Sequence, residues 1–276
     1  MIPENISQSG FTKTIPSFSG RVKGVWGRKN LMNANFESVN LCDLALACSM
    51  YNSLTSFNVS LVDLKEKTDD SIDLTKLCHC THVVEWLNKW GCRHLSKKSH
   101  DIASSAILDW YNQEGMKLFP IGKALWELDN QEMATVITAY GSLKDRAGAY
   151  PIRGGKKLQI DIGPTAASKI LFAVRPEALM PWDEAMRNEF GCDGSKESYS
   201  KFLMVIKKLA CRIGELCKAN DFDISELPHK MDRDGSTVLE LINEYVWVTV
   251  TRKCKLPSAQ NLALWAQWGL SSEKKT

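Results

Sequence analysis

A glycine–proline turn and a lone downstream acid form the part of the sequence whose residue types and spacing could do chemistry. Gly163 and Pro164 open a run of small residues that is typical of a helix start, and Asp183 follows a Pro-bounded loop at the head of the next expected helix. The free N–H groups of a helix start can bind phosphate. A carboxylate at a helix start in an apolar setting can act as an acid or a base. Together they predict a protein that holds a nucleic-acid backbone beside a catalytic pocket.

The residues around the turn would complete a phosphate site. Gly163 can adopt a positive φ, and Pro164 suits the first position of a helix. Two adjacent lysines upstream and one lysine downstream could add positive charge around a phosphate. The nucleic-acid-binding residues expected from the sequence are therefore Gly163, Thr165, Lys156, Lys157 and Lys169.

Two residues beside the acid are candidates for the wall of a pocket. Trp182 adjoins Asp183 and could form one side of a pocket for a base, and Arg187 lies one helical turn beyond the acid. A purely structural interpretation is also open. In that interpretation Asp183 is a helix-start residue favoured by the helix dipole and paired with Arg187.

The segment from Leu158 to Gly191 resembles the helix-hairpin-helix DNA glycosylase superfamily, and it is most similar to divergent, uncharacterised branches of it. Members carry a glycine-containing hairpin followed by Thr-Ala, then an apolar helix, and then an Asp at the head of a helix that ends near a Leu/Phe-Gly pair. The residues that match this pattern are Gly163, Thr165, Ala166, Asp183, Phe190 and Gly191.

The resemblance implies a mainly α fold: a two-lobed helical bundle with a helix-hairpin-helix core at about 140–220. It also implies binding of double-stranded DNA and monofunctional N-glycosylase activity on a flipped base, as in base-excision repair. The carboxylate of Asp183 would stabilise the positively charged sugar while water attacks it. Members that also cleave the backbone have a Lys where Pro164 stands. No lyase activity is therefore expected.

Departures from the family pattern keep other functions open. Asp161 stands where the family has its first hairpin glycine, and the turn is one residue short. The alternative is a catalytically inactive helix-hairpin-helix module that binds nucleic acid or another protein. A third class is an enzyme that acts on a small molecule in a helical cleft. Replacement of Asp183 by Asn would separate a glycosylase from an inactive module.

Hydrophobic spacing predicts the elements that position these residues. After Asn40, apolar residues recur at steps of three and four, which predicts an all-α body of about ten helices. The segment Val246–Val250 could equally form a strand, and 144–159 is expected to be a glycine-rich basic connector. The expected helices run over 41–54, 74–87, 99–115, from Asp129 or Asn130 through Tyr140, along 202–216, and over 237–248 and 258–268.

Composition places the chain among ordinary globular proteins. It is 44% hydrophobic and 24% charged, with a net charge of +3. Residues 1–35 are basic and aromatic, with no acid between Glu4 and Glu37. They predict an arm that lies on a polyanion, or an extended segment held to the body by its aromatic residues. The rest, 36–276, is expected to be the α-helical domain.

Cysteine usage indicates a reducing compartment. The nine cysteines are odd in number and irregular in spacing, which argues against a disulfide framework. The N-terminus lacks the basic start and apolar run of a signal peptide, and no stretch has the apolar length to cross a bilayer. We expect an intracellular, soluble protein in the cytoplasm, with the nucleoid or nucleus as alternatives, and no membrane partner.

A cluster of cysteines and histidines could hold zinc, because such side chains bind it tetrahedrally. Standard finger spacing is absent, which favours core cysteines and surface histidines instead. We therefore expect no metal and no cofactor, and the sequence predicts no particular protein partner. The cluster comprises Cys78, His79, Cys80, His82, Cys92, His94 and His100.

Overall fold

Helices make up nearly all the regular structure of the computed structural model, which describes residues 36, 38–95 and 97–273. All of these belong to one unit of the chain, 31–276. The expected arm, 1–35, lies outside the described residues. The helices, in chain order, are α1 (Leu41–Leu54), α2 (Phe57–Lys67), α3 (Leu77–Lys89), α4 (His100–Gln113), α5 (Asn130–Lys144), α6 (Gly163–Val174), α7 (Glu184–Glu189), α8 (Lys196–Lys218), α9 (Leu227–Lys230), α10 (Val238–Val246) and α11 (Ala259–Glu273).

Shorter elements join these helices. Short 3-10 turns lie at Lys97–Ser99, Gly115–Lys117, Leu125–Glu127 and Ile224–Glu226, and the π-helix η5 (Trp247–Thr251) continues α10. Four strands lie between α5 and α6. They are β1 (Ala147–Ala149), β2 (Ile152–Arg153), β3 (Lys156–Lys157) and β4 (Ile160–Asp161), with β1 antiparallel to β4 and β2 antiparallel to β3.

Local caps explain where several helices begin. The side chain of Asn40 accepts a hydrogen bond from the backbone N–H of Asp43 at 2.8 Å and starts α1. At α5 the carboxylate of Asp129 accepts from the N–H of Glu132, whose own carboxylate accepts from the N–H of Asp129. Each cap satisfies N–H groups that the first helical turn leaves without a partner.

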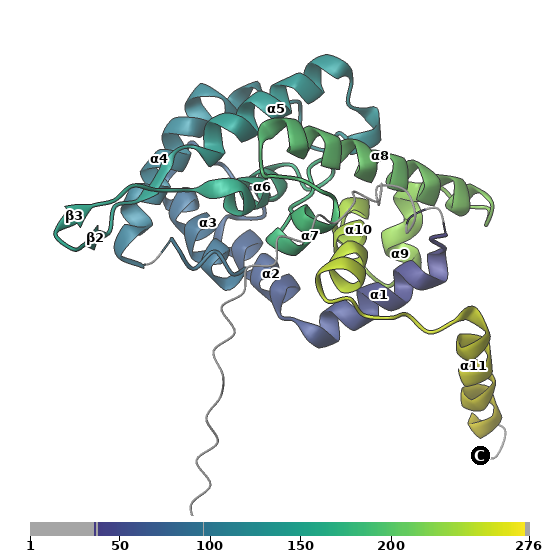
Figure 1. The fold of residues 1–276 in the computed structure, drawn as a ribbon. Coiled ribbons are helices and arrows are strands. Elements are labelled where there is room, and N and C mark those ends of the chain that lie inside the picture. Colours follow the sequence, from purple (N-terminus) through teal and green to yellow (C-terminus); the bar gives the residue numbers. More distant parts are fainter. Residues whose placement is uncertain (1–35, 37, 96, 274–276) are drawn as a thin grey trace, which may run out of the picture. The chain divides into compact units, whose positions relative to one another are not determined.

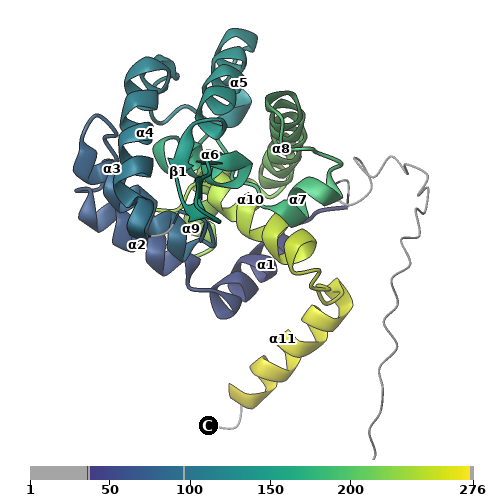
Figure 2. The same cartoon turned by 60° about the vertical axis from the view of Figure 1, so that its left-hand side comes forward.

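Helix α6 lies in the middle of the body (Figures 1 and 2). It packs against α3 on one side and α5 on the other. Every residue from Ala166 to Val174 is buried. A helix that is buried all round must be largely apolar all round, and the sequence of α6 is. Its N-terminus, at Gly163, is thereby fixed in position by its neighbours.

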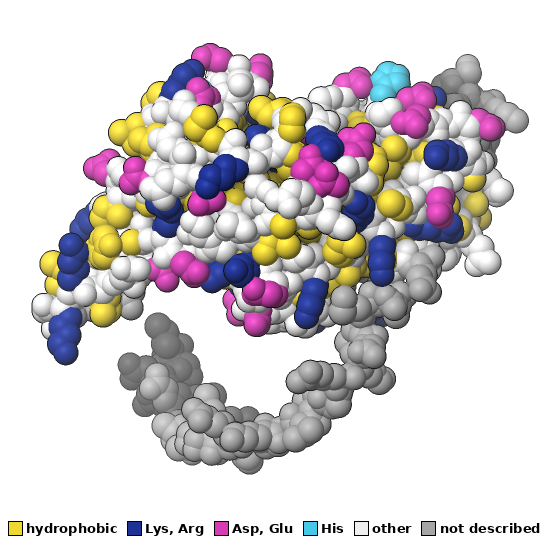
Figure 3. Space-filling view, turned by 90° about the horizontal axis from the view of Figure 1, so that it is seen from above, with side chains coloured by type: hydrophobic (Ala, Val, Ile, Leu, Met, Phe, Trp, Pro, Cys, Tyr) yellow, Lys and Arg dark blue, Asp and Glu magenta, His cyan; other side chains and the backbone are white. Residues whose placement is uncertain are grey.

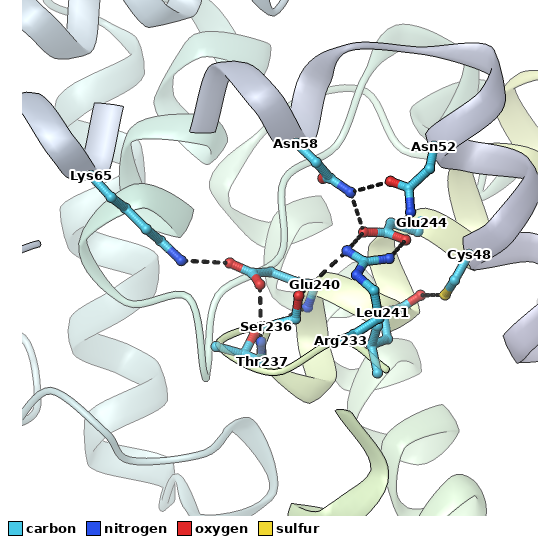
Figure 4. Close-up of polar contacts among 10 residues, drawn as sticks. All are labelled: Cys48, Asn52, Asn58, Lys65, Arg233, Ser236, Thr237, Glu240, Leu241 and Glu244. Carbon is cyan, nitrogen blue, oxygen red and sulfur yellow. Dashed lines mark hydrogen bonds and ion pairs between the residues drawn. The ribbon is translucent and has the colours of Figure 1, made fainter. Parts of the chain in front are cut away.

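A buried network of charged and amide side chains joins α10 to the N-terminal helices (Figure 4). The Arg233 guanidinium donates to both carboxylate oxygens of Glu244, at 2.6 and 2.8 Å. Asn58 of α2 donates to Glu244 at 2.9 Å. Lys65 Nζ lies 3.5 Å from Glu240 Oε1. Both glutamates are buried, so any negative charge on them depends on these partners and not on water.

The structure confirms the mainly α architecture and corrects its details. The buried side chains form one connected cluster, so the two lobes expected from the sequence share a core. The expected connector at 144–159 contains β1, β2 and β3, and the element just before Gly163 is strand β4 where a helix-hairpin-helix would have a helix. Val246–Val250 is helical, so the strand alternative is wrong. Among the described residues, no helix combines the length and apolarity that crossing a membrane requires.

Candidate functional site

A pocket of about 410 Å³ opens at the N-terminus of α6. Its volume falls within the range of about 300–1,000 Å³ that is usual for small-molecule sites. The sequence-predicted residues Gly163, Thr165, Lys169, Asp183 and Arg187 all line it. The turn and the acid therefore meet at one hollow, as the sequence predicts.

The turn before α6 is shaped by the short strands. The Ile162 N–H donates to the carbonyl of Arg146 at 2.8 Å, next to the β1–β4 ladder. Gly163 then has a φ of +77°, a conformation that favours glycine, and the chain turns into α6. His94 Nε2 contacts the Ile162 carbonyl at 3.0 Å and lines the pocket beside it.

Asp183 holds its carboxylate at the pocket through two hydrogen bonds. It is the N-cap of α7, and its Oδ1 accepts from the N–H of Met186 at 2.8 Å. Its Oδ2 accepts from the hydroxyl of Thr251 at 2.8 Å. These two bonds use two of the four lone-pair sites of the carboxylate. The half-buried group can therefore accept further hydrogen bonds from a molecule in the pocket.

Arg187 does not pair with Asp183 in the described part of the chain. Its Nη1 donates to the Thr165 hydroxyl at 2.7 Å, and its guanidinium lies 5.8 Å from the centre of the Trp182 ring. Arg187 therefore connects the first turn of α6 to α7. The ion pair considered from the sequence is replaced by this contact, and among the described residues no cation lies within ion-pair distance of the Asp183 carboxylate.

The aromatic wall of the pocket was not foreseen from the sequence. It consists of Phe57, Trp90 and Trp247. The Phe57 ring centre lies 5.4 Å from that of Trp90 and 5.9 Å from that of Trp247. Each of the three stands at a helix end: the start of α2, and the C-caps of α3 and α10. An aromatic residue at a helix end is the only signal that the sequence offers for them.

Trp182 is a core residue and not part of that wall. Its side chain is 1% exposed, and it packs against Tyr199 and Phe202 with ring centres 5.0 and 5.2 Å away. Its Nε1 donates to the Pro164 carbonyl at 3.2 Å. It lines a cavity of only about 30 Å³ behind Asp183. Trp182 therefore lies outside the lining of the larger pocket and holds the turn and the acid together from behind.

Lys169 lines the pocket and is nearly buried. The residue is 8% exposed, and its Nζ donates to the carbonyl of Trp90 and lies 5.6 Å from the centre of the Trp90 ring. Burial lowers the pKa of its ammonium group. The sequence placed this lysine at a phosphate, whereas the structure places it against the aromatic wall.

Lys156 and Lys157 stand apart from the pocket. They form β3 of the β2–β3 hairpin, which projects from the body (Figure 1), and both side chains are exposed. The Lys157 ammonium lies 4.5 Å from the centre of the Tyr150 ring. Neither lysine lines the pocket, so the structure does not bring them to the Gly163 turn.

The cysteine and histidine cluster is dispersed. Cys80 is buried and donates to the Leu74 carbonyl, whereas Cys78 is exposed. His79 Nδ1 accepts from the Asp73 N–H, and His100 contacts Asn88. Within the described residues, no three His, Cys, Asp or Glu side chains gather in a way that could hold a metal ion.

A second pocket, of about 350 Å³, lies where α7 gives way to α8 and is lined in part by Cys192, Asp193 and Lys201. The Asp193 carboxylate accepts from the N–H of Ser195 at 2.9 Å, and hydrogen bonds from Ser195 hold its pKa below the usual range. The Asp193 carboxylate therefore stabilises the turn before α8. The pocket at Asp183 has the richer chemistry, because it joins an acid, an amine, an aromatic wall and a helix N-terminus.

Comparison of the chain with protein-family models, with curated protein sequences and with solved structures gave no match.

Proposed function

We propose that the pocket at Asp183 accepts a base flipped out of double-stranded DNA and that the protein hydrolyses the bond between that base and its sugar. The observation that carries the proposal is the meeting of Asp183, the Gly163 turn and three aromatic rings at one pocket of about 410 Å³. The proposal also draws on the resemblance of 158–191 to helix-hairpin-helix DNA glycosylases, although a strand precedes the turn here.

Base binding would use the aromatic wall. Flat bases stack on aromatic side chains, and such stacking tolerates any base because every base has a π-face. Phe57 and Trp247 are half-buried, so each leaves ring surface available at the pocket. The Arg252 guanidinium lies 5.5 Å from the centre of the Trp247 ring and carries positive charge to this edge.

Backbone binding would use the start of α6. Its first N–H groups, at Gly163 and Thr165, lie where a helix dipole favours a phosphate, and Arg187 is bonded to the Thr165 hydroxyl beside them. The β2–β3 hairpin, with Lys156 and Lys157, would contact the duplex farther away. On the face shown in Figure 3, over α5 and α8, acidic and basic side chains are interspersed, so the proposed contact is at the pocket and not there.

The Asp183 carboxylate would act on the sugar. As the bond from C1′ to the base nitrogen breaks, its electron pair leaves with the base and positive charge develops on the sugar. A fixed carboxylate stabilises that charge, water then adds to C1′, and the proton that the water loses is taken up by the departing base. The bonds from Met186 and Thr251 fix the carboxylate before the substrate arrives. No step needs a lysine at the position of Pro164, so the proposed enzyme is monofunctional.

Replacement of Asp183 by Asn tests the proposal. Asn is as good an N-cap as Asp, so α7 is retained. The charge is lost, and the amide nitrogen can only donate to the Thr251 hydroxyl, which donates to Asp183 in the wild type. We expect the wild type to release a base from at least one member of a panel of duplexes with alkylated, deaminated or oxidised bases. Asp183→Asn should lower that rate by about 100-fold or more, with duplex affinity equal or higher. Asp193→Asn, which removes an acid outside this pocket, should leave the rate unchanged.

Other outcomes would decide against an enzyme. Duplex binding by the wild type without base loss from any member of the panel would identify an inactive nucleic-acid-binding module. Failure to bind duplex at all would overturn the proposal in both its parts.

A further inference from the structure

Lys169 is a buried amine for which base hydrolysis has no use. It reaches the pocket from the middle of α6, lines both the large pocket and the small cavity behind it, and is 8% exposed. A buried ammonium ion is costly unless an opposite charge pairs with it. Within the described residues no carboxylate lies within ion-pair distance of it; its hydrogen bond goes to the neutral carbonyl of Trp90.

The surroundings of the amine favour its neutral form. The Trp90 ring covers one side of Nζ, and Cys92 lines the same pocket. Burial raises the pKa of the Cys92 thiol, so this neighbour is uncharged at neutral pH. Asp183 attracts the ammonium only weakly compared with the effect of burial, and the net result is a lowered pKa of Lys169. A neutral amine can still donate one N–H to the Trp90 carbonyl while its lone pair stays available.

We propose that Lys169 is a carbonyl-reactive lysine, whose amine condenses in this pocket with a short aliphatic aldehyde. Desolvated lysines are the usual nucleophiles of this chemistry. The lone pair of Nζ attacks the carbonyl carbon, and the π electrons and a proton from nitrogen pass to the oxygen, which forms a carbinolamine. Loss of water then forms the imine. One amine and one aldehyde give one imine and one water, and no oxidant or reductant is needed.

A structural role for Lys169 makes a different prediction. Trp90 is the C-cap of α3, where a protonated lysine would be favoured by the helix dipole. In that case the group would stay charged and would not react with aldehydes. Reactivity at neutral pH therefore separates the two roles.

Reductive trapping tests the inference on the folded full-length chain. The protein is treated at neutral pH with propionaldehyde and cyanoborohydride, which reduces any imine to a stable secondary amine, and the modified lysines are located by peptide mass spectrometry. We expect Lys169 to be labelled faster than Lys156 and Lys157, since its lowered pKa raises the fraction of free amine at neutral pH. In urea this advantage should disappear.

Variants provide matched controls. Lys169→Arg keeps a donor toward the Trp90 carbonyl and should abolish the fast labelling, whereas Lys208→Arg, at an exposed position of α8, should not affect it. Absence of label on Lys169, or labelling no faster than at the exposed lysines, would overturn the inference. Trapping at Lys169 does not depend on base release. A wild type that is labelled at Lys169 but releases no base would contradict only the proposed glycosylase, and a wild type that releases a base but is not labelled there would contradict only this inference.

Discussion

The hydroxyl of Thr251 donates to Asp183 Oδ2 at 2.8 Å and joins the last residue of η5 to the head of α7. The first residue of the same π-helix, Trp247, forms part of the aromatic wall. The Arg252 N–H bonds to the Trp247 carbonyl, an i to i+5 pattern that adds a residue to the turn. One short irregular element therefore positions both the acid and a wall of the pocket.

Loss of the Thr251 hydroxyl should destabilise this junction. Thr251→Val keeps the shape of the side chain but leaves one oxygen of a half-buried carboxylate without its donor. We expect a loss of about 1–2 kcal/mol in the free energy of unfolding, measured by urea denaturation. Thr251→Ser, which keeps the hydroxyl, should lose clearly less. Equal losses in the two variants would show that the methyl group, and not the hydrogen bond, matters here.

The Arg233–Glu244 pair should be essential to stability. Glu244→Gln leaves a largely buried guanidinium without its carboxylate, and we expect a loss of about 3–5 kcal/mol in the free energy of unfolding. Glu215 provides the control, because its pair with Arg212 is exposed on both sides. Glu215→Gln should change the free energy by less than about 0.5 kcal/mol. Similar effects of the two substitutions in urea denaturation would contradict the prediction.

Glu240 should impose a pH dependence on stability. Burial raises the pKa of its carboxyl, and Lys65 opposes this only in part. The folded state thus binds this proton more tightly than the unfolded state. The contribution of Glu240 to the free energy of unfolding is therefore fully favourable below the ordinary pKa of a glutamate. It is lost as the pH rises through the raised pKa of the folded state.

Glu240→Gln removes that titration while keeping an acceptor for the Thr237 N–H. In urea denaturation from about pH 4 to pH 7, the variant should gain stability relative to the wild type as the pH rises. A difference in the free energy of unfolding between variant and wild type that stays constant across this pH range would show that Glu240 titrates alike in the folded and unfolded states.

Gly148 should accommodate a side chain poorly. A Cβ added there would lie 2.5 Å from Cδ2 of the buried Leu95 and 3.4 Å from the backbone nitrogen of Ile162, just before the Gly163 turn. We expect Gly148→Ala to lose about 1–3 kcal/mol in the free energy of unfolding through overpacking. Gly214→Ala in α8 is the control, because its Cβ would make only ordinary contacts. It should gain about 0.5–1 kcal/mol through helix propensity.

Hydrophobic spacing predicts the helices whose burial is one-sided. In α8 the expected core residues Phe202, Ile206 and Ile213 are buried and Lys208 is exposed, because a 3.6-residue repeat directs them to opposite faces. The Asp129 cap and the helix head at Asp183 were likewise predictable, since capping depends on a few adjacent residues. The meeting of the turn and the acid at one pocket was expected from the resemblance and not from these local rules.

Features that depend on distant contacts were not predictable in this way. The strands between Ala147 and Asp161 are two or three residues long, too short for any alternation to show. The wall of Phe57, Trp90 and Trp247 is assembled from three elements far apart in the chain, and periodicity says nothing about such meetings. Trp182 was misplaced for the same reason: its neighbour in sequence faces the pocket, but its ring faces the core.

The packing of α1 against α10 has a consequence for biosynthesis. Cys48 of α1 bonds to the carbonyl of Leu241, and the Tyr51 ring centre lies 5.1 Å from that of Trp247. The first helix of the body therefore emerges from the ribosome long before its partner has been translated. Until then the apolar face of α1 is exposed to solvent and must be shielded by other contacts or by chaperones. A nascent chain arrested before Val238 should accordingly tend to aggregate. Release of the full-length polypeptide should let α1 pack against α10.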